Sequence, residues 1–137
     1  MDYLVIPAYE PDYNLIRLIK KVREKSDFEV IVINDGSSAS CNRVFEQAAT
    51  YATVLHHSLN QGKGQALKTA FRYIQSQGHY GVIVTADADG QHKLWDILRV
   101  ANAAHEQPQK LILGARSFTG KVPVSYTHLT LPTTPYV

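Results

Sequence analysis

Four short apolar runs constrain the fold more than any other feature of this 137-residue chain. The runs lie at residues 3–6, 30–33, 82–84 and 111–113. None of them shows the polar alternation of a strand with one face in water, so they are typical of strands buried on both faces of a sheet. A weaker run at residues 52–55 precedes His56 and His57, which we interpret as a strand end rather than as metal ligands. The sequence therefore predicts five strands.

Helical patterns separate these runs. Their apolar residues recur at spacings of three, four and seven, which places one apolar stripe on each helix. The four stripes are Leu15, Leu18, Ile19 and Val22; Val44, Phe45, Ala48 and Ala49; Ala66, Leu67, Ala70, Phe71 and Ile74; and Leu94, Ile97, Leu98 and Ala101. We expect Pro11 to start the first helix, Ser37 or Ser38 to cap the second, and Gly62 with Gly64 to open the third. Strands that alternate with helices predict an α/β fold with a mostly parallel, doubly wound sheet.

Composition narrows the class of protein further. The chain is 45% hydrophobic and 19% charged, which argues for a globular domain with a real core. Its 14 Lys and Arg against 12 Asp and Glu are spread along the sequence, so the net charge of +2 does not suggest a nucleic-acid partner. A single cysteine, Cys41, predicts a reducing, cytoplasmic compartment. No signal pattern or transmembrane segment is expected, and Cys41 and Trp95 are expected to be packing residues.

The last fourteen residues, 124–137, break this pattern. They hold four threonines, two prolines and no Asp, Glu, Lys or Arg. They also resemble the translation of a sequencing-library adapter. We therefore expect a domain over residues 1–123 followed by a non-native tail over 124–137, with a genuine disordered tail as the alternative.

Polar residues follow the predicted strands. In an open parallel sheet, ligands bind beyond the carboxyl ends of the strands. The segments found there are Pro7-Ala8-Tyr9-Glu10, Asn34-Asp35-Gly36-Ser37-Ser38, Asp87-Ala88-Asp89-Gly90-Gln91-His92 and Gly114-Ala115-Arg116. We expect all four segments to line one crevice.

Asp87 and Asp89 are the sharpest pair among these residues. Carboxylates at i and i+2 in a strand-to-loop turn can converge on one hard divalent cation, and Gln91 offers a third oxygen. Mg²⁺ or Mn²⁺ held in this way would bridge a diphosphate and stabilise the charge that develops as it leaves. A helix cap beside a solvated acid is the alternative interpretation.

Three further sites could contact the nucleotide or a phosphate, and two of them also have a structural interpretation. Asp35 could accept a hydrogen bond from a base or a ribose hydroxyl, or could form an Asx turn. The segment Gly62-Lys63-Gly64 precedes a helix, so its amides and cation could face phosphate, although it lacks the Walker pattern. Arg116 could grip a phosphate with two hydrogen bonds or form a surface ion pair.

Taken together, the motifs resemble the family 2 glycosyltransferases over residues 1–123. The segments that support the resemblance are Val5-Ile6-Pro7-Ala8-Tyr9-Glu10, Val32-Ile33-Asn34-Asp35-Gly36-Ser37-Ser38, Asn60-Gln61-Gly62-Lys63-Gly64 and Asp87-Ala88-Asp89-Gly90-Gln91-His92. The continuation Leu113-Gly114-Ala115-Arg116-Ser117-Phe118 is similar to the polyprenol-phosphate branch, which includes the dolichol-phosphate-mannose-synthase-like enzymes.

The resemblance implies part of a Rossmann-like GT-A domain that transfers a sugar from a UDP or GDP donor to a polyprenyl phosphate. It implies dependence on Mg²⁺ or Mn²⁺ and a location at the cytoplasmic face of a membrane in the full protein. The implied site residues are Pro7, Tyr9, Glu10 and Asp35 at the nucleoside; Asp87 at the ribose and metal; Asp89 and Gln91 at the metal; Lys63 beside the diphosphate; and Arg116 at the acceptor phosphate.

Two alternatives remain open. A phosphotransferase of the haloacid-dehalogenase type also uses Asp-x-Asp with Mg²⁺, but there the motif follows the first strand, whereas Asp87 follows the fourth. A non-catalytic module that binds nucleotide sugars is the stronger alternative, because acceptor-binding elements are expected beyond Pro123.

Overall fold

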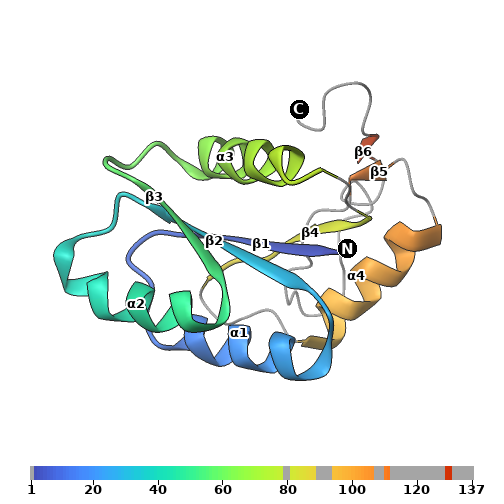
Figure 1. Ribbon diagram of the computed structural model, residues 1–137, viewed down its shortest axis with the longest axis horizontal. Coiled ribbons are helices and arrows are strands. Elements are labelled where there is room, and N and C mark those ends of the chain that lie inside the picture. The colour runs from blue at the N-terminus through green and yellow to red at the C-terminus, as the bar shows by residue number, and fades with distance from the viewer. Residues whose placement is uncertain (1, 79–80, 89–93, 107–109, 112–128, 131–137) are drawn as a thin grey trace, which may run out of the picture.

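A four-stranded parallel sheet forms the centre of the molecule (Figure 1). The computed structural model describes residues 2–78, 81–88, 94–106, 110–111 and 129–130. The strands are β1 (Tyr3–Ala8), β2 (Glu29–Asp35), β3 (Thr53–His57) and β4 (Ile83–Thr85), in the order β3-β2-β1-β4. Every neighbouring pair in this sheet is parallel. The predicted α/β class with a parallel sheet is confirmed.

Helices cover both faces of the sheet. On one face lie α1 (Asn14–Lys25), α2 (Asn42–Tyr51) and α4 (Leu94–Glu106), and on the other lies α3 (Lys63–Ser76) (Figure 1). Leu4 and Val32 point to the three-helix face, whereas Val5 and Ile31 pack against α3. The chain runs from β1 to β2 to β3 and then returns past β1 to β4, and right-handed crossovers therefore put α3 on the opposite face from α1 and α2. Burial on both sides explains why the strands are apolar throughout.

Two helix starts differ from the predictions. Helix α1 begins at Asn14 rather than at Pro11, and the Asp12 carboxylate accepts the Asn14 N–H at 2.9 Å in an Asx turn just before the helix. Ser38 stands before a short 3₁₀ helix (Ala39–Cys41) that leads into α2, but its hydroxyl donates to Glu10 and caps no helix. Gly62 is the N-cap of α3, as predicted.

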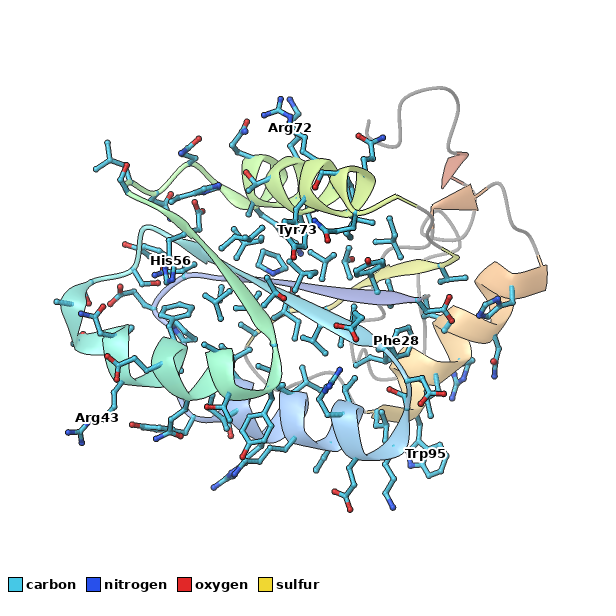
Figure 2. The ribbon with its side chains drawn as sticks, viewed as in Figure 1. Phe28, Arg43, His56, Arg72, Tyr73 and Trp95 are labelled. Carbon is cyan, nitrogen blue, oxygen red and sulfur yellow. The ribbon has the colours of Figure 1, made fainter. Side chains whose placement is uncertain are left out.

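The prediction that Trp95 packs in the core is wrong, and the prediction for Cys41 is confirmed. Trp95 is 74% exposed and points away from the sheet (Figure 2). Ile97, two residues later, faces the core, and a helix turns by about 200° over two residues, so Trp95 lies on the opposite side of α4. The Cys41 side chain is buried beside the Pro11 carbonyl. Ala49, included in the stripe predicted for α2, is exposed.

The fifth predicted strand does not extend the parallel sheet within the described residues. Its described part is β5 (Lys110–Leu111), which pairs antiparallel with β6 (Leu129–Thr130) in a separate two-stranded sheet. Residues 112–113 lie outside the described part of the chain, as does most of 124–137, so the domain boundary at residue 123 stays a prediction. No described helix is both long enough and apolar enough to cross a bilayer.

Candidate functional site at the carboxyl edge of the sheet

Pro7 ends the pairing between β1 and β4. The Tyr3 N–H donates to Val82 and the Val5 carbonyl accepts from Ala86, so alternate residues of β1 face β4. Pro7 is the next residue in this series and has no N–H to donate. The pairing with β4 accordingly covers three residues, whereas the pairing with β2 continues to Ala8. Pro7, predicted as a nucleoside contact, thus lies where β1 and β4 stop pairing, at the edge where the predicted crevice lies.

Glu10 ties the loop after β1 to the loop after β2. Its carboxylate accepts hydrogen bonds from the Ser38 N–H and, at 2.8 Å, from the Ser38 hydroxyl. Its own N–H donates to the Ser37 hydroxyl at 2.9 Å. The bonds from the Ser38 backbone and hydroxyl lower the pKa of Glu10, so this exposed carboxyl stays ionised. Beside it, Tyr9 exposes 58% of its surface and presents an aromatic ring at the same edge.

Asp35 is buried at the end of β2, and its carboxylate holds the turn before α3. Its Oδ1 accepts hydrogen bonds from His57 Nδ1 at 2.8 Å and from the Gln61 N–H at 2.9 Å, and its Oδ2 accepts the Gly62 N–H at 2.9 Å. Burial would raise the pKa of Asp35, but the bonds from His57, Gln61 and Gly62 outweigh it, and the pKa is lowered. The residue is therefore a buried, ionised carboxylate.

His57 and His56 end β3, as predicted, and both rings are engaged within the protein. His57 Nε2 lies 2.7 Å from the Thr69 hydroxyl of α3, and His56 Nδ1 lies 3.0 Å from Asn34 Nδ2. Sequence reasoning missed the bond between His57 and Asp35. The parallel register pairs these two residues directly, and no local sequence pattern indicates that register.

Lys63 connects the start of α3 to the end of β4. Its Nζ lies 2.8 Å from Asp87 Oδ1, and the two side chains are 54% and 23% exposed. Because Gly62 donates to Asp35 and the next residue reaches Asp87, the ends of β2 and β4 meet at the start of α3. The structure thus brings Asp35, Lys63 and Asp87 to one edge, as expected.

Asp87 is the only one of the three predicted metal ligands that lies among the described residues. Its carboxylate is partly exposed and already faces a cation, the ammonium of Lys63. Among the described residues no group of three or more His, Cys, Asp or Glu could hold a metal. The other predicted ligands, Asp89 and Gln91, lie outside the described residues, as does Arg116, so their roles stay predictions.

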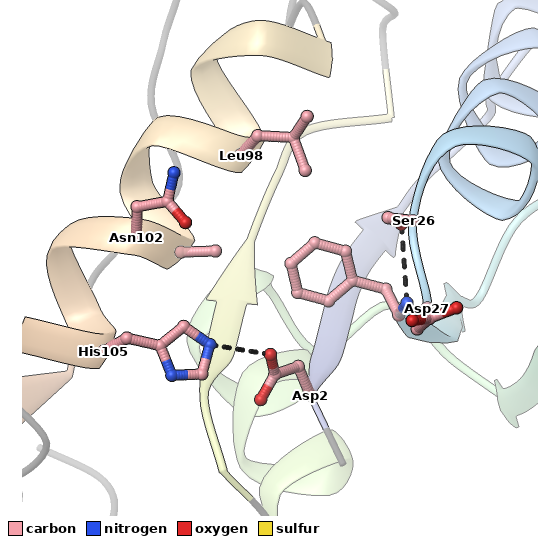
Figure 3. Close-up of a pocket in the computed structure, with 8 residues that line it drawn as sticks. Asp2, Ser26, Asp27, Leu98, Asn102 and His105 are labelled. Atoms are coloured by element: carbon pink, nitrogen blue, oxygen red, sulfur yellow. Dashed lines mark hydrogen bonds and ion pairs between the residues drawn. The ribbon is translucent and has the colours of Figure 1, made fainter.

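A cavity of about 540 Å³ lies at the opposite edge of the sheet (Figure 3). Phe28, Leu98 and Asn102 line it, together with His105, whose Nε2 bonds Asp2 at 2.8 Å. Asp2 and Phe28 precede β1 and β2, so this cavity lies at the amino ends of the strands. Ligands of parallel sheets bind at the carboxyl ends, which favours the edge with Asp35 and Asp87 as the functional site.

Comparison with known proteins identifies the family of the chain. The sequence model for "Glycosyl transferase family 2" matches residues 3–136. The chain is 29% identical over 114 residues to the dolichyl-phosphate beta-glucosyltransferase of Saccharomyces cerevisiae, covering 73% of this chain and 33% of that protein. It is 26% identical over 122 residues to the polyprenol monophosphomannose synthase of Mycolicibacterium smegmatis, covering 85% and 45%.

A third relative is the UDP-N-acetylglucosamine--dolichyl-phosphate N-acetylglucosaminyltransferase of Methanococcus voltae, 23% identical over 129 residues, which cover 83% of this chain and 51% of that protein. No solved structure matches the chain. The chain spans between a third and about half the length of these three relatives, and their names agree with the predicted polyprenol-phosphate branch. Since the family match covers nearly the whole sequence, the chain belongs to glycosyl transferase family 2.

Proposed function

We propose that the carboxyl edge of the sheet binds a nucleoside diphosphate sugar, UDP- or GDP-linked, and that the sugar is transferred to a polyprenyl phosphate with the help of Mg²⁺ or Mn²⁺. The observation that supports this most strongly is the path from Asp35 through Gly62 and Lys63 to Asp87. It joins the candidate nucleoside region to the candidate metal region at one edge.

Each part of the proposed site has its own task. Pro7, Tyr9 and Glu10 would receive the nucleoside together with Asp35, and the Lys63 ammonium would face the diphosphate. Asp87 would hold the cation together with Asp89 and Gln91, and Arg116 would meet the phosphate of the acceptor. The cation, when bound, would neutralise charge on the leaving diphosphate.

The proposed transfer depends more on positioning and charge stabilisation than on a strong general base. The phosphate of a polyprenyl acceptor is itself the nucleophile, so placing it in line and stabilising charge are the main requirements. The described histidines near the site fit this: His57 bonds Asp35 and Thr69, and His56 bonds Asn34. The single buried Cys41 fits a reducing compartment, and we place the reaction at the cytoplasmic face of a membrane.

Calorimetry with UDP and GDP, each with and without Mn²⁺, tests the donor site. We expect Mn²⁺ to raise the affinity for one of the two nucleotides by about tenfold or more, because the cation joins carboxylates to phosphates. Equal affinity with and without Mn²⁺ would contradict the proposed metal dependence. No binding of either nucleotide would contradict the proposed donor site itself.

Removing the Lys63 cation is expected to weaken this binding without unfolding the protein. The exposed pair with Asp87 contributes at most about 1 kcal/mol to stability. Lys63→Met should lower the affinity for the diphosphate in Mn²⁺ by about tenfold, since a charge-assisted bond to phosphate is lost. Lys21→Met, an exposed lysine of α1, is the matched control and should leave the affinity unchanged. An equal effect of the two variants would exclude Lys63 from the site.

A binding module without transferase activity is the second candidate, because the contacts that link Asp35 to Asp87 support donor binding and do not by themselves supply transfer. Incubation with radiolabelled nucleotide sugar and a polyprenyl phosphate in detergent separates the two. Donor binding with no labelled lipid would favour the binding module.

A further inference from the structure

We infer that Asp35, His57 and Thr69 form a positioning chain that fixes the turn at residues 61–63 for the donor's diphosphate. This inference rests on the proposed function and names residues that position the proposed binding site. His57 and Thr69 need not touch the donor. They would act through the backbone that Asp35 holds.

The positioning chain links three elements through short, buried contacts. Asp35 ends β2 and His57 ends β3, and the two are register partners 2.8 Å apart from Oδ1 to Nδ1. Thr69 lies on α3, and its hydroxyl is 2.7 Å from His57 Nε2. The side chains of Asp35 and His57 are 5% and 8% exposed. Such shielding from water makes the contacts stronger and more directional than surface pairs.

Contacts within the protein already use most of the hydrogen-bonding capacity of the Asp35 carboxylate. An ionised carboxylate only accepts, and its two oxygens offer about four lone-pair sites. His57, Gln61 and Gly62 occupy three of them. About one site remains, so Asp35 can accept one hydrogen bond from the nucleoside while it holds the two backbone amides.

The turn that these amides belong to leads directly to the predicted diphosphate region. Gly62 is the N-cap of α3 and Lys63 is its first residue, with Nζ at Asp87. Free N–H groups at a helix start favour phosphate. Asp35 fixes the turn before the helix, and Thr69, in its second turn, ties the helix to His57. The positioning chain therefore fixes both the direction and the position of the start of α3.

Comparing UMP with UDP in Mn²⁺ by calorimetry separates positioning from nucleoside contact, because only UDP carries the second phosphate. GDP and GMP replace them if the protein prefers guanine. In the wild type we expect UDP to bind at least about tenfold more tightly than UMP. His57→Leu should bring UDP close to the UMP affinity and leave UMP unchanged. His57→Asn should restore much of the difference, because its amide can donate in place of Nδ1.

His105→Leu is the matched control, since it also breaks a 2.8 Å contact between a histidine and an aspartate, but at the amino edge. It should leave both affinities unchanged. An equal fall for UMP and UDP in His57→Leu, or equal wild-type affinities, would overturn the positioning role while leaving nucleotide binding in place. A wild type that binds no nucleotide would overturn the proposed function itself.

Amide hydrogen exchange gives a second measurement that needs no ligand. The Gln61 and Gly62 amides should be protected in the wild type and should lose at least about tenfold in protection in His57→Leu, while β1 keeps its protection. Asn at position 57 should give intermediate values. Unprotected Gln61 and Gly62 amides in the wild type, or the same protection in all variants, would contradict the role of the positioning chain.

Discussion

Gly36→Ala is expected to lower the free energy of unfolding by about 2–5 kcal/mol, from left-handed backbone strain and a steric clash. Gly36 has a φ of +72°, and a Cβ placed there would lie 2.2 Å from the Asn60 backbone nitrogen and 2.4 Å from the Leu59 carbonyl carbon. Both contacts are with backbone, so no rotamer change can relieve them. The displaced segment also leads into Gln61 and Gly62, and the variant should lose nucleotide binding as well.

Gly78→Ala is the matched control for this prediction. Gly78 has a φ of +101°, but an added Cβ would meet no heavy atom within 4 Å. Alanine there should cost only the conformational part, about 1–2 kcal/mol. Urea denaturation of the two variants measures the difference. Equal losses would show that the close approach of Gly36 to the 59–60 backbone is not as the structure has it.

Asp35→Asn is expected to destabilise the protein by about 3 kcal/mol at neutral pH. The change replaces a carboxylate oxygen, which accepts hydrogen bonds, with an NH₂ group that faces other hydrogen-bond donors. The carboxylate is surrounded by His57 Nδ1 and the N–H groups of Gln61 and Gly62. The amide of asparagine must point its NH₂ at one of them. Asp27→Asn, at an exposed position before β2, is the control and should change stability by less than about 0.5 kcal/mol.

The same variant should change how stability depends on pH. The pKa of Asp35 lies below its ordinary 3.8, because the hydrogen bonds outweigh burial. A lowered pKa adds stability that is complete above the unfolded value and is lost as pH falls through the folded value. The gap between wild type and Asp35→Asn should therefore shrink as the pH falls below about 4. Thermal melting from pH 7 to pH 2 measures it, and a constant gap would contradict an ionised Asp35.

The fold could be predicted from sequence because its signals are local. The runs at 3–6 and 30–33 lack alternation, which already implies cover on both faces, and helices on both faces provide it. The clusters after β2 and β4 could be placed at one edge from the rule for parallel strands, and Lys63 joins them. Patterns over a few residues were sufficient to predict both the fold and the edge of the sheet at which the candidate site lies.

The internal contacts of the site could not be predicted, because they depend on register and on competing caps. Asp35 and His57 are 22 residues apart, and only the pairing of β2 with β3 brings them together. Helix α1 begins at Asn14, after an Asx turn in which the Asp12 carboxylate accepts the Asn14 N–H, and Pro11 alone did not indicate that turn. Trp95 appeared apolar enough for the core, but the side of α4 on which it lies was decided by packing.

Amide NMR spectra recorded with UDP or GDP and substoichiometric Mn²⁺ test the central claim most directly, since the paramagnetic ion broadens signals of nearby residues. We predict broadening at Gly62, Lys63 and Asp87, with the signals of Asp2 and His105 at the amino edge unchanged. Broadening centred on Asp2 and His105, or sharp signals at Lys63 and Asp87, would contradict a nucleotide and metal site at the carboxyl edge of the sheet.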